Sequence, residues 1–382
     1  MNCQDVLLKI DEINDEYLNI LEDVCNLESP TADKARVDAV GLYFVRMAKA
    51  RGWEIEIASQ ERAGDVVTIT LNPHAKTAPI VLSGHIDTVH PVGSFGSPAV
   101  RRDDKRMYGP GVMDCKGGVV AAFMAMDALA QCGFSSRPVH LILQTDEETG
   151  SRTSNKATIA YMCEKSKDAI AFLNLEGHLS GTAALIRKGI LQYRFKVRGK
   201  ALHSSRCYDA ANAIAEAASK ILRLEKMKDR NGLTCNCGLI HGGTVANTVA
   251  EECEFVADIR FGNKDQLHVA REKVRRIAHT YRIDGCSCEY TEINFRPAMP
   301  LCEQNEALLA KMNEIYQSVG LPVLAARECP SGSDAAYITE AGIPCVDCIG
   351  TEGRNIHSVD EYIELCSLAE SAKRIAAVVA EI

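Results

Sequence analysis

Apolar and polar positions follow two kinds of pattern along most of this 382-residue chain. Short apolar runs, typical of buried strands, are separated by stretches with the 3.6-residue repeat of an amphipathic helix. Strand and helix units that alternate in this way build a mostly parallel sheet covered by helices. The pattern predicts strands over 65–71, 80–83, 139–144, 169–175 and 344–349, and helices over 117–131, 155–164, 306–319 and 363–380.

Between about residues 181 and 295 the order of elements changes. The apolar pattern there predicts strands over 190–197, 235–241, 251–260 and 286–293, and helices over 210–227 and 264–281. This β-α-β-β-α-β order is typical of a ferredoxin-like unit with its own sheet. We therefore predict an α/β protein in which a large, mostly parallel-sheet domain carries an inserted smaller α+β domain. The predicted bounds are 1–180 plus 296–382 for the large domain and 181–295 for the insertion.

Composition excludes several classes of protein. The 43 Lys and Arg residues against 51 Asp and Glu give a net charge of -8, which argues against a binder of nucleic acid or of an anionic membrane. No run of 18 apolar residues predicts a membrane span, and the acidic N-terminus lacks the features of a signal peptide. The 16 cysteines form no paired C-x-x-C sets, so we expect reduced thiols in a cytoplasmic protein.

Polar residues gather where the strands of the large domain are expected to end, which is where open parallel sheets bind ligands. Each cluster taken alone has an ordinary explanation as a helix cap or a solvated turn. Together they offer imidazoles and several carboxylates, and this donor set suits two ions of Zn²⁺ or a similar cation. The clusters are GHIDTV (84–89), GPGVMDCKGG (109–118), DEETG (146–150), EGH (176–178) and NIHS (355–358).

Spacing within two of these clusters suggests a division of roles. His85 and Asp87 are two residues apart, so an extended segment places both side chains on one side. This arrangement suits a ligand imidazole that is oriented by a carboxylate. The adjacent Glu147 and Glu148 would allow one carboxylate to bind metal while the other moves a proton.

The ordered set of motifs resembles the co-catalytic zinc metallopeptidases related to bacterial glutamate carboxypeptidase (carboxypeptidase G). That family also holds acetylornithine deacetylase, succinyl-diaminopimelate desuccinylase, aminoacylase and several dipeptidases. The matches run in order from about residue 80 to 360. The motifs are GHIDTVHP, YGPGVMDCKGG, TDEETGS, LEGH, GKALHSS, GGTVANTVAE, ADIR and NIHSVDEY.

The resemblance implies two divalent metal ions, with Zn²⁺ expected and Co²⁺ or Mn²⁺ accepted by the same ligands. Asp114 would bridge both ions. His85 and Glu176 would complete one site, and Glu148 and His357 the other. The peptide bond after Asp114 is expected to be cis.

The same resemblance implies the catalytic and substrate-binding residues. Glu147 would be the general base, and Asp87 would orient the neighbouring ligand histidine. His203 would polarise the scissile carbonyl, in some relatives from across a dimer interface. Asn247 and Arg260 would hold the free carboxylate of the substrate, for which the planar fork of an arginine is well suited.

Two further residues have an ordinary and a functional interpretation. Ser333 lies in an SGSD loop that resembles a family loop near the substrate, although the same residues would also make a turn and a helix cap. Cys115 follows the expected bridging ligand, where a small side chain against the helix start would explain it. Because it is the only cysteine beside the predicted metal site, we expect thiol reagents to act mainly through Cys115.

The predicted function is a two-metal hydrolase that cleaves a peptide or amide bond beside a free carboxylate. A deacylase of the acetylornithine deacetylase or desuccinylase type, or a dipeptidase, is the alternative. A metal-binding protein without hydrolytic activity is a third possibility, but it would have no need of Glu147. The expected substrate is a small peptide or acyl-amino acid, and the family favours a homodimer formed through the inserted lid domain.

Overall fold

A computed structural model describes residues 1–230 and 232–382, and its contacts divide the chain into two units. Among the described residues, no helix combines the length and the apolar character that crossing a membrane requires. Unit 1 comprises Met1–Leu185, Leu301–Glu328 and Tyr337–Ile382, and unit 2 comprises Ile186–Pro300 and Cys329–Ala336.

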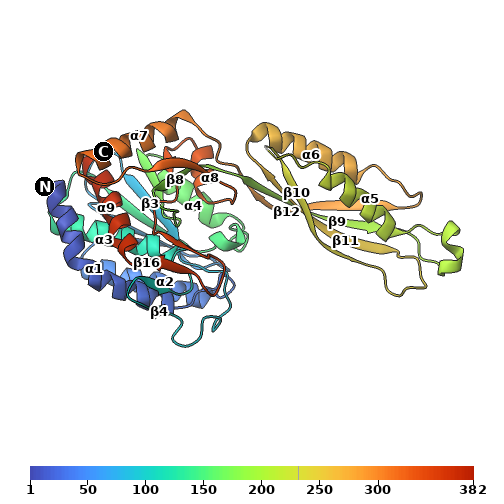
Figure 1. Ribbon diagram of the computed structural model, residues 1–382, viewed down its shortest axis with the longest axis horizontal. Coiled ribbons are helices and arrows are strands. Elements are labelled where there is room, and N and C mark those ends of the chain that lie inside the picture. Colours follow the sequence, from blue (N-terminus) through green and yellow to red (C-terminus); the bar gives the residue numbers. More distant parts are fainter. Residues whose placement is uncertain (231) are drawn as a thin grey trace. The chain divides into compact units, whose positions relative to one another are not determined.

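The central sheet of unit 1 has six strands in the order β1-β2-β6-β3-β7-β14, and β3 is labelled in Figure 1. The last four strands in this order are parallel, while β1 and β2 run antiparallel to their neighbours. This arrangement confirms the mostly parallel sheet expected from the sequence. The strands are β1 (Glu54–Ala58), β2 (Val66–Leu71), β3 (Ile80–His85), β6 (Val139–Gln144), β7 (Ala171–Asn174) and β14 (Cys345–Val346).

Two smaller sheets are present besides the central sheet and the sheet of unit 2. One has the order β15-β16-β5-β4 and the other pairs β13 with β8. Their strands are β4 (Arg101–Arg102), β5 (Arg106–Tyr108), β8 (Thr182–Arg187), β13 (Ala325–Cys329), β15 (Gly353–Arg354) and β16 (Tyr362–Glu364).

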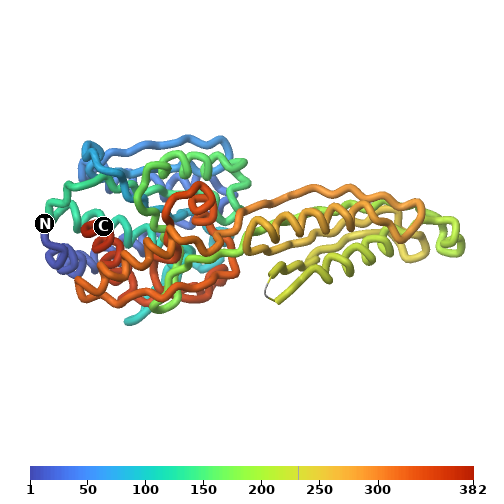
Figure 2. The backbone as a smooth tube through the Cα atoms, turned by 90° about the horizontal axis from the view of Figure 1, so that it is seen from above, coloured from blue at the N-terminus to red at the C-terminus, as the bar shows by residue number. Residues whose placement is uncertain are grey.

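The helices of unit 1 include two near the N-terminus, α1 and α2, that the sequence analysis did not predict. The ends of the chain lie close together, since Cys3 of α1 packs in one cluster with Ala377 of α9 (Figure 2). The helices are α1 (Cys3–Asn26), α2 (Lys34–Ala50), α3 (Lys116–Gln131), α4 (Ala157–Ser166), α7 (Glu303–Ser318), α8 (Ala335–Glu340) and α9 (Cys366–Glu381), with a 3-10 turn η1 (Glu147–Thr149).

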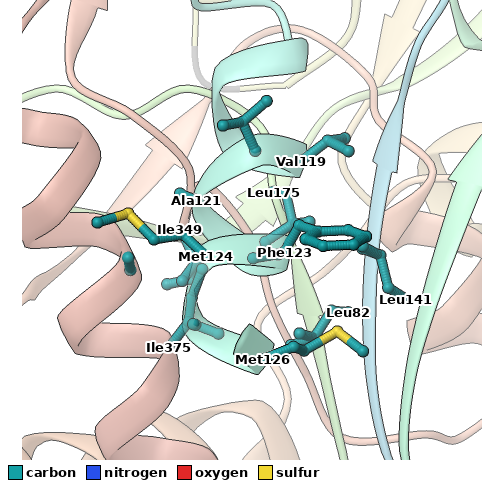
Figure 3. Close-up of a cluster of buried hydrophobic side chains, with 14 of the residues drawn as sticks. Leu82, Val119, Ala121, Phe123, Met124, Met126, Leu141, Leu175, Ile349 and Ile375 are labelled. Carbon is teal, nitrogen blue, oxygen red and sulfur yellow. The ribbon is translucent and has the colours of Figure 1, made fainter. Parts of the chain in front are cut away.

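Helix α3 lies at the centre of the unit 1 core. Its sequence is apolar on nearly all sides, as expected for a helix that is covered all round, and its residues from Lys116 to Leu129 are buried. Leu82 and Leu141 of the sheet and Ile375 of α9 belong to the cluster around it (Figure 3). Full burial of a side chain such as Phe123 contributes about 1.5–3 kcal/mol. This packing fixes the segment that leads into the helix.

Unit 2 has the β-α-β-β-α-β order predicted from the sequence. Its sheet has the antiparallel order β10-β11-β9-β12, and the two helices lie side by side on one face of it (Figures 1 and 2). Alternate residues of β9 and β11 are buried. The ring of Phe195 on β9 stacks on that of Phe255 on β11, with the ring centroids 4.6 Å apart. The elements are β9 (Gly189–Arg198), β10 (Thr234–Gly242), β11 (Glu252–Phe261), β12 (Ser287–Arg296), α5 (Ala213–Glu225), α6 (Lys264–Ala278) and the 3-10 turn η2 (Ser204–Asp209).

Candidate metal centre

Three neighbouring parallel strands of the central sheet end at the same edge. His85, the last residue of β3, lies opposite Gln144, the last residue of β6. Glu147 and Glu148 follow β6 in the turn η1, and Glu176 comes two residues after β7. The strand ends therefore bring four of the predicted site residues to one edge of the sheet, as open parallel sheets do for ligands.

Two further predicted ligands lie on loops at a second sheet. Asp114 follows β5 and precedes α3, while His357 lies between β15 and β16. Because β5 and β16 are antiparallel neighbours, with Tyr108 opposite Tyr362, the loop after β5 and the loop before β16 leave the sheet at the same end. His357 has a φ of 61°, in the left-handed region. The peptide bond between Asp114 and Cys115 is cis, as the family resemblance implies.

The five predicted ligands form two groups that share Asp114. In the first group, Nε2 of His85 lies 3.0 Å from Oδ1 of Asp114 and 3.8 Å from Oε1 of Glu176. In the second, Nε2 of His357 lies 3.2 Å from Oδ2 of Asp114 and 3.3 Å from Oε2 of Glu148. In each group one ligand atom per residue lies within 4.8 Å of the others.

The clustered carboxylates favour positive charge at this site. Hydrogen bonds with Asp114 and Glu148 raise the pKa of His357 to about 10. Burial raises the pKa of Glu148 to about 7, although the hydrogen bond from His357 lowers it. The negative charge of Asp114 adds to the rise. Burial opposes the ionisation of Asp114, but its bonds with the two histidines hold its pKa well below the usual range. Divalent cations would compete with these protons for the same atoms.

The donor set fits two divalent cations that share one carboxylate. Its atoms are imidazole nitrogens and carboxylate oxygens, the ligands that suit zinc and its neighbours in the transition series. The nearby thiol of Cys115 has a different task, because its Sγ accepts a hydrogen bond from the backbone N–H of His85 at 3.1 Å.

Asp87 connects the first ligand group with the segment that carries the predicted base. Its backbone oxygen lies 3.0 Å and its Oδ1 3.4 Å from Nδ1 of His85, which orients the imidazole. The same carboxylate accepts hydrogen bonds from the backbone N–H groups of Glu147 and Glu148, each at 3.2 Å. The hydroxyl of Thr31, which the sequence analysis missed, donates to Oδ2 at 2.7 Å.

The start of α3 is held tightly against its surroundings. A Cβ atom on Gly118 would lie 2.0 Å from the backbone oxygen of Leu175, so only glycine allows this approach. Lys116, which is fully buried, donates from Nζ to the carbonyl oxygens of Val24 and Leu27 at the end of α1, both at 3.2 Å. Lys116 has no predicted role from the sequence, although a lysine within a wholly apolar helix start is unusual.

The placement of Cys115 argues against the expectation that thiol reagents act mainly through it. Its side chain is fully buried, and burial raises the pKa of its thiol to about 12. The thiolate is the reactive form of cysteine, so Cys115 is protected in two ways. Cys207 and Cys366 are the exposed cysteines of the chain.

In unit 2, two predicted substrate-binding residues lie side by side. His203 pairs with Thr248, and the backbone N–H of Ser204 donates to the carbonyl oxygen of Asn247 at 2.9 Å. These pairs extend the β9-β11 ladder beyond Glu252. His203 and Asn247 are thus neighbours at one end of the unit 2 sheet.

Arg260 lies toward the other end of the same sheet. Arg260 lies eight residue steps beyond Glu252 along β11, or about 26 Å at the usual rise of about 3.3 Å per residue. Arg260 donates from Nε and Nη2 to the two carboxylate oxygens of Asp258, at 2.7 and 3.2 Å. Unit 2 as described therefore does not bring Arg260 together with His203 and Asn247.

Ser333 is fully buried in unit 2. Its loop lies beside two buried arginines: Arg187 donates to the hydroxyl of Ser331 at 2.9 Å, and Arg296 lies 3.6 Å from Asp334. The turn expected here is present, since the backbone N–H of Ala336 donates to the carbonyl oxygen of Ser333. In this conformation a substrate could not reach the Ser333 hydroxyl.

Comparisons with known proteins agree with this geometry. The family model described as peptidase family M20/M25/M40 matches residues 81–381. Carboxypeptidase G2 of Pseudomonas sp. (strain RS-16) is 25% identical over 360 residues, which cover 92% of this chain and 85% of the relative. Succinyl-diaminopimelate desuccinylase of Stenotrophomonas maltophilia (strain R551-3) is 26% identical over 318 residues, covering 77% and 82%.

A solved structure of a dinuclear metal-binding M20 peptidase from Bacillus subtilis shares the fold. It has a TM-score of 0.72 at 16% identity and covers 97% of this chain and 98% of its own. M20 peptidases bind two divalent metals, and this chain has the candidate ligand groups for both. The chain therefore belongs to the peptidase family M20/M25/M40 and is a metallopeptidase-type hydrolase.

Proposed function

We propose that this chain hydrolyses a peptide or amide bond beside a free carboxylate, in the manner of a glutamate carboxypeptidase. One observation carries the proposal: two ligand groups share Asp114, and Glu147 adjoins the ligand Glu148 without belonging to either group among the described residues. A protein that only bound metal would have no use for a carboxylate in this position.

The metal ions would be held by the five residues of the two groups. Bound there, two divalent cations would supply Lewis acidity to the scissile carbonyl and lower the pKa of the attacking water. Zn²⁺ is our first expectation, with Co²⁺ and Mn²⁺ as alternatives, because imidazole and carboxylate ligands accept all three.

The protein's own groups would handle the proton and the developing charge. Glu147, which is only 9% exposed, would take a proton from the attacking water and return it to the leaving amine. Asp87 would keep Glu147 in place through the backbone of η1. His203 would stabilise the oxyanion, for which one donor typically contributes about 3–4 kcal/mol.

The substrate's carboxylate would be held by Asn247 and Arg260, the residues that the family resemblance assigns to this task. Arg260 already bonds a carboxylate in bidentate fashion, that of Asp258, and a substrate carboxylate would replace it there. The likeness to carboxypeptidase G2 supports a peptide that is cleaved beside its C-terminal carboxylate as substrate. The likeness to a desuccinylase supports the second candidate, removal of an acyl group from an amino acid.

A homodimer would allow all three unit 2 residues to serve one substrate. Since Arg260 lies at least about 26 Å along the sheet from His203 and Asn247, one copy of unit 2 cannot present them together to a small peptide. Two copies could. The edge strand β10 exposes Leu239 and Ile240, and an exposed apolar sheet edge favours pairing with another chain.

The protein's setting follows from the same proposal. The structure places none of the 16 cysteines in a disulfide, which suits the reducing cytoplasm that we propose as its location. We propose a small peptide or an acyl-amino acid as the substrate.

A Glu147→Gln variant tests the proposed function. We expect it to bind two metal ions as the wild type does and to lose about 10²- to 10⁴-fold in kcat. Glu164→Gln is the matched control, because Glu164 is an exposed carboxylate paired with Lys167, and it should leave kcat unchanged. Rates on C-terminal glutamyl peptides and on N-succinyl and N-acetyl amino acids would separate the two candidate reactions. Full turnover by Glu147→Gln with both ions bound would refute its role as the base.

A further inference from the structure

Glu361 is a buried carboxylate that the mechanism above does not use. It follows His357 by four residues and immediately precedes β16, and the residue is only 1% exposed. Buried carboxylates are rare unless they are paired or hydrogen-bonded. Its partners show what it does in this fold.

Three backbone N–H groups of the loop that carries Asp114 donate to the Glu361 carboxylate. The N–H groups of Met113 and Asp114 donate to Oε1 at 2.8 and 3.0 Å, and that of Gly111 donates to Oε2 at 3.4 Å. The backbone oxygen of Glu361 also accepts a bond from the N–H of Gly109, at 3.3 Å. Four bonds therefore join the segment of Glu361 to residues 109–114.

These bonds link the two loops that carry Asp114 and His357. Both loops lie outside regular secondary structure, so no ladder of strand or helix bonds fixes them. Yet Oδ2 of Asp114 and Nε2 of His357, which lie 3.2 Å apart, must stay close together for both residues to contact one ion. Glu361 belongs to the second loop and binds the backbone of the first, at Asp114 itself.

We propose that Glu361 is a positioning residue that holds the Asp114 loop and the His357 loop together, so that both side chains can bind the shared metal site. The inference rests on the proposed two-metal function. It does not depend on the charge of Glu361. A carboxyl group keeps an oxygen that accepts bonds from the N–H groups of Met113 and Asp114 in either protonation state.

Outer residues that orient metal ligands typically change metal affinity about 10- to 100-fold when they are removed. Glu361 should have its larger effect on the ion held by Asp114, Glu148 and His357, because that site takes two ligands from the loops it joins. The ion held by His85, Asp114 and Glu176 takes only one.

The test compares Glu361→Ala and Glu361→Gln with the matched control Glu364→Gln. Gln keeps an acceptor oxygen for the two shorter bonds but cannot accept from Gly111 with its amide nitrogen. Glu364 lies three residues away on β16, where it forms a partly exposed ion pair with Arg106 at 2.9 Å. The readouts are Zn²⁺ stoichiometry and affinity by competition with a chromophoric chelator, and the rise in Tm when Zn²⁺ is added to metal-free protein.

We expect Glu361→Ala to bind the Zn²⁺ ion held by Asp114, Glu148 and His357 about 10- to 100-fold less tightly than the wild type. The Zn²⁺ affinity of Glu361→Gln should lie between those of Glu361→Ala and the wild type, and that of Glu364→Gln should match the wild type. A purely structural role would lower the Tm of the metal-free and metal-loaded protein equally and leave both affinities unchanged, which would overturn the inference. If Glu361→Ala does not fold, Glu361→Gln decides the matter by the same measurements.

Failure of the proposed function would look different. If the wild type binds two ions but hydrolyses no substrate of the panel, the proposed function fails, while a loss of Zn²⁺ affinity in the Glu361 variants still supports the positioning role. If the wild type binds no metal, both proposals fall.

Discussion

Mixing a His203→Ala variant with an Arg260→Ala variant tests whether two chains build one active site. Within unit 2 the two residues are separated by at least about 26 Å along the sheet, whereas a dipeptide spans about 7 Å when extended. If both residues contact one substrate, they must come from different copies. A heterodimer of the two variants would then have one site with both residues intact and one site with neither.

The expected magnitudes make the result easy to detect. His203→Ala alone should lower kcat about 10²- to 10³-fold through the lost oxyanion donor. Arg260→Ala alone should raise KM, because a charge-assisted bond is worth about 1.5–3 kcal/mol, or roughly 10- to 150-fold. Random pairing of equal amounts gives half heterodimers with one good site each, so the mixture should regain about a quarter of wild-type activity.

The assay is the steady-state rate of metal-loaded protein after the two variants are co-expressed in equal amounts and purified together, without separation of the homodimers from the heterodimers. Light scattering would establish the dimer in parallel. A mixture no more active than the mean of the two variants alone would refute the exchange of residues between chains. Undiminished activity of Arg260→Ala by itself would instead remove Arg260 from the site.

Three further predictions concern stability and reactivity. Arg51 lies 2.7 Å from the buried Asp127. Burial by itself would raise the pKa of Asp127, but the bond with Arg51 holds it below its usual 3.8. Asp127→Asn should therefore cost about 2 kcal/mol of unfolding free energy at pH 7. That stabilisation is present above pH 4 and lost as the pH falls further, so urea titrations of both proteins should converge in acid. Removal of the metals by a chelator should lower the Tm, because an ion at about 100 times its Kd adds about 2.7 kcal/mol per site; an unchanged Tm would count against resident metals. A maleimide reagent should label Cys207 and Cys366 well before Cys115, and mass spectrometry of peptides would reveal the reverse order.

Most of the fold could be predicted because its strands are apolar runs bounded by polar clusters. The predicted strand 139–144 matches β6. The predicted helix 117–131 ends where α3 ends and begins one residue later than α3 does. The C-terminal part was predicted less well. Only Cys345 and Val346 of the apolar run 344–349 form β14, since Cys348 has a φ of 63° and leaves the extended conformation.

The last helix shows how tertiary pairing can override a local pattern. The apolar repeat predicts a helix from residue 363, yet residues Tyr362–Glu364 form β16 and pair with β5, so α9 begins only at Cys366. The local apolar repeat contains no information about the pairing partner β5, which lies more than 250 residues earlier in the chain.

The ligands could be predicted and their supports could not, for a physical reason. Histidines and carboxylates at strand ends are recognisable from residue type and spacing, and the family motifs assigned their roles. Thr31 and Glu361 act on the site through hydrogen bonds to Asp87 and to the backbone of Asp114. Such contacts depend on which loops meet in space. The pairing of Arg260 with Asp258 could have been predicted, because side chains two residues apart on one strand point to the same face of the sheet.

The bonds of Asp87 have a consequence for how this site tolerates change. One carboxylate orients His85 and also anchors the backbone of Glu147 and Glu148. Substitutions at these positions should therefore be strongly epistatic: once Asp87 is replaced, the further loss of any partner should cost less than it does in the wild type. A lineage that loses Asp87 would weaken one metal ligand and the general base in a single step, whereas recovery would require its return or coordinated changes in two separate loops.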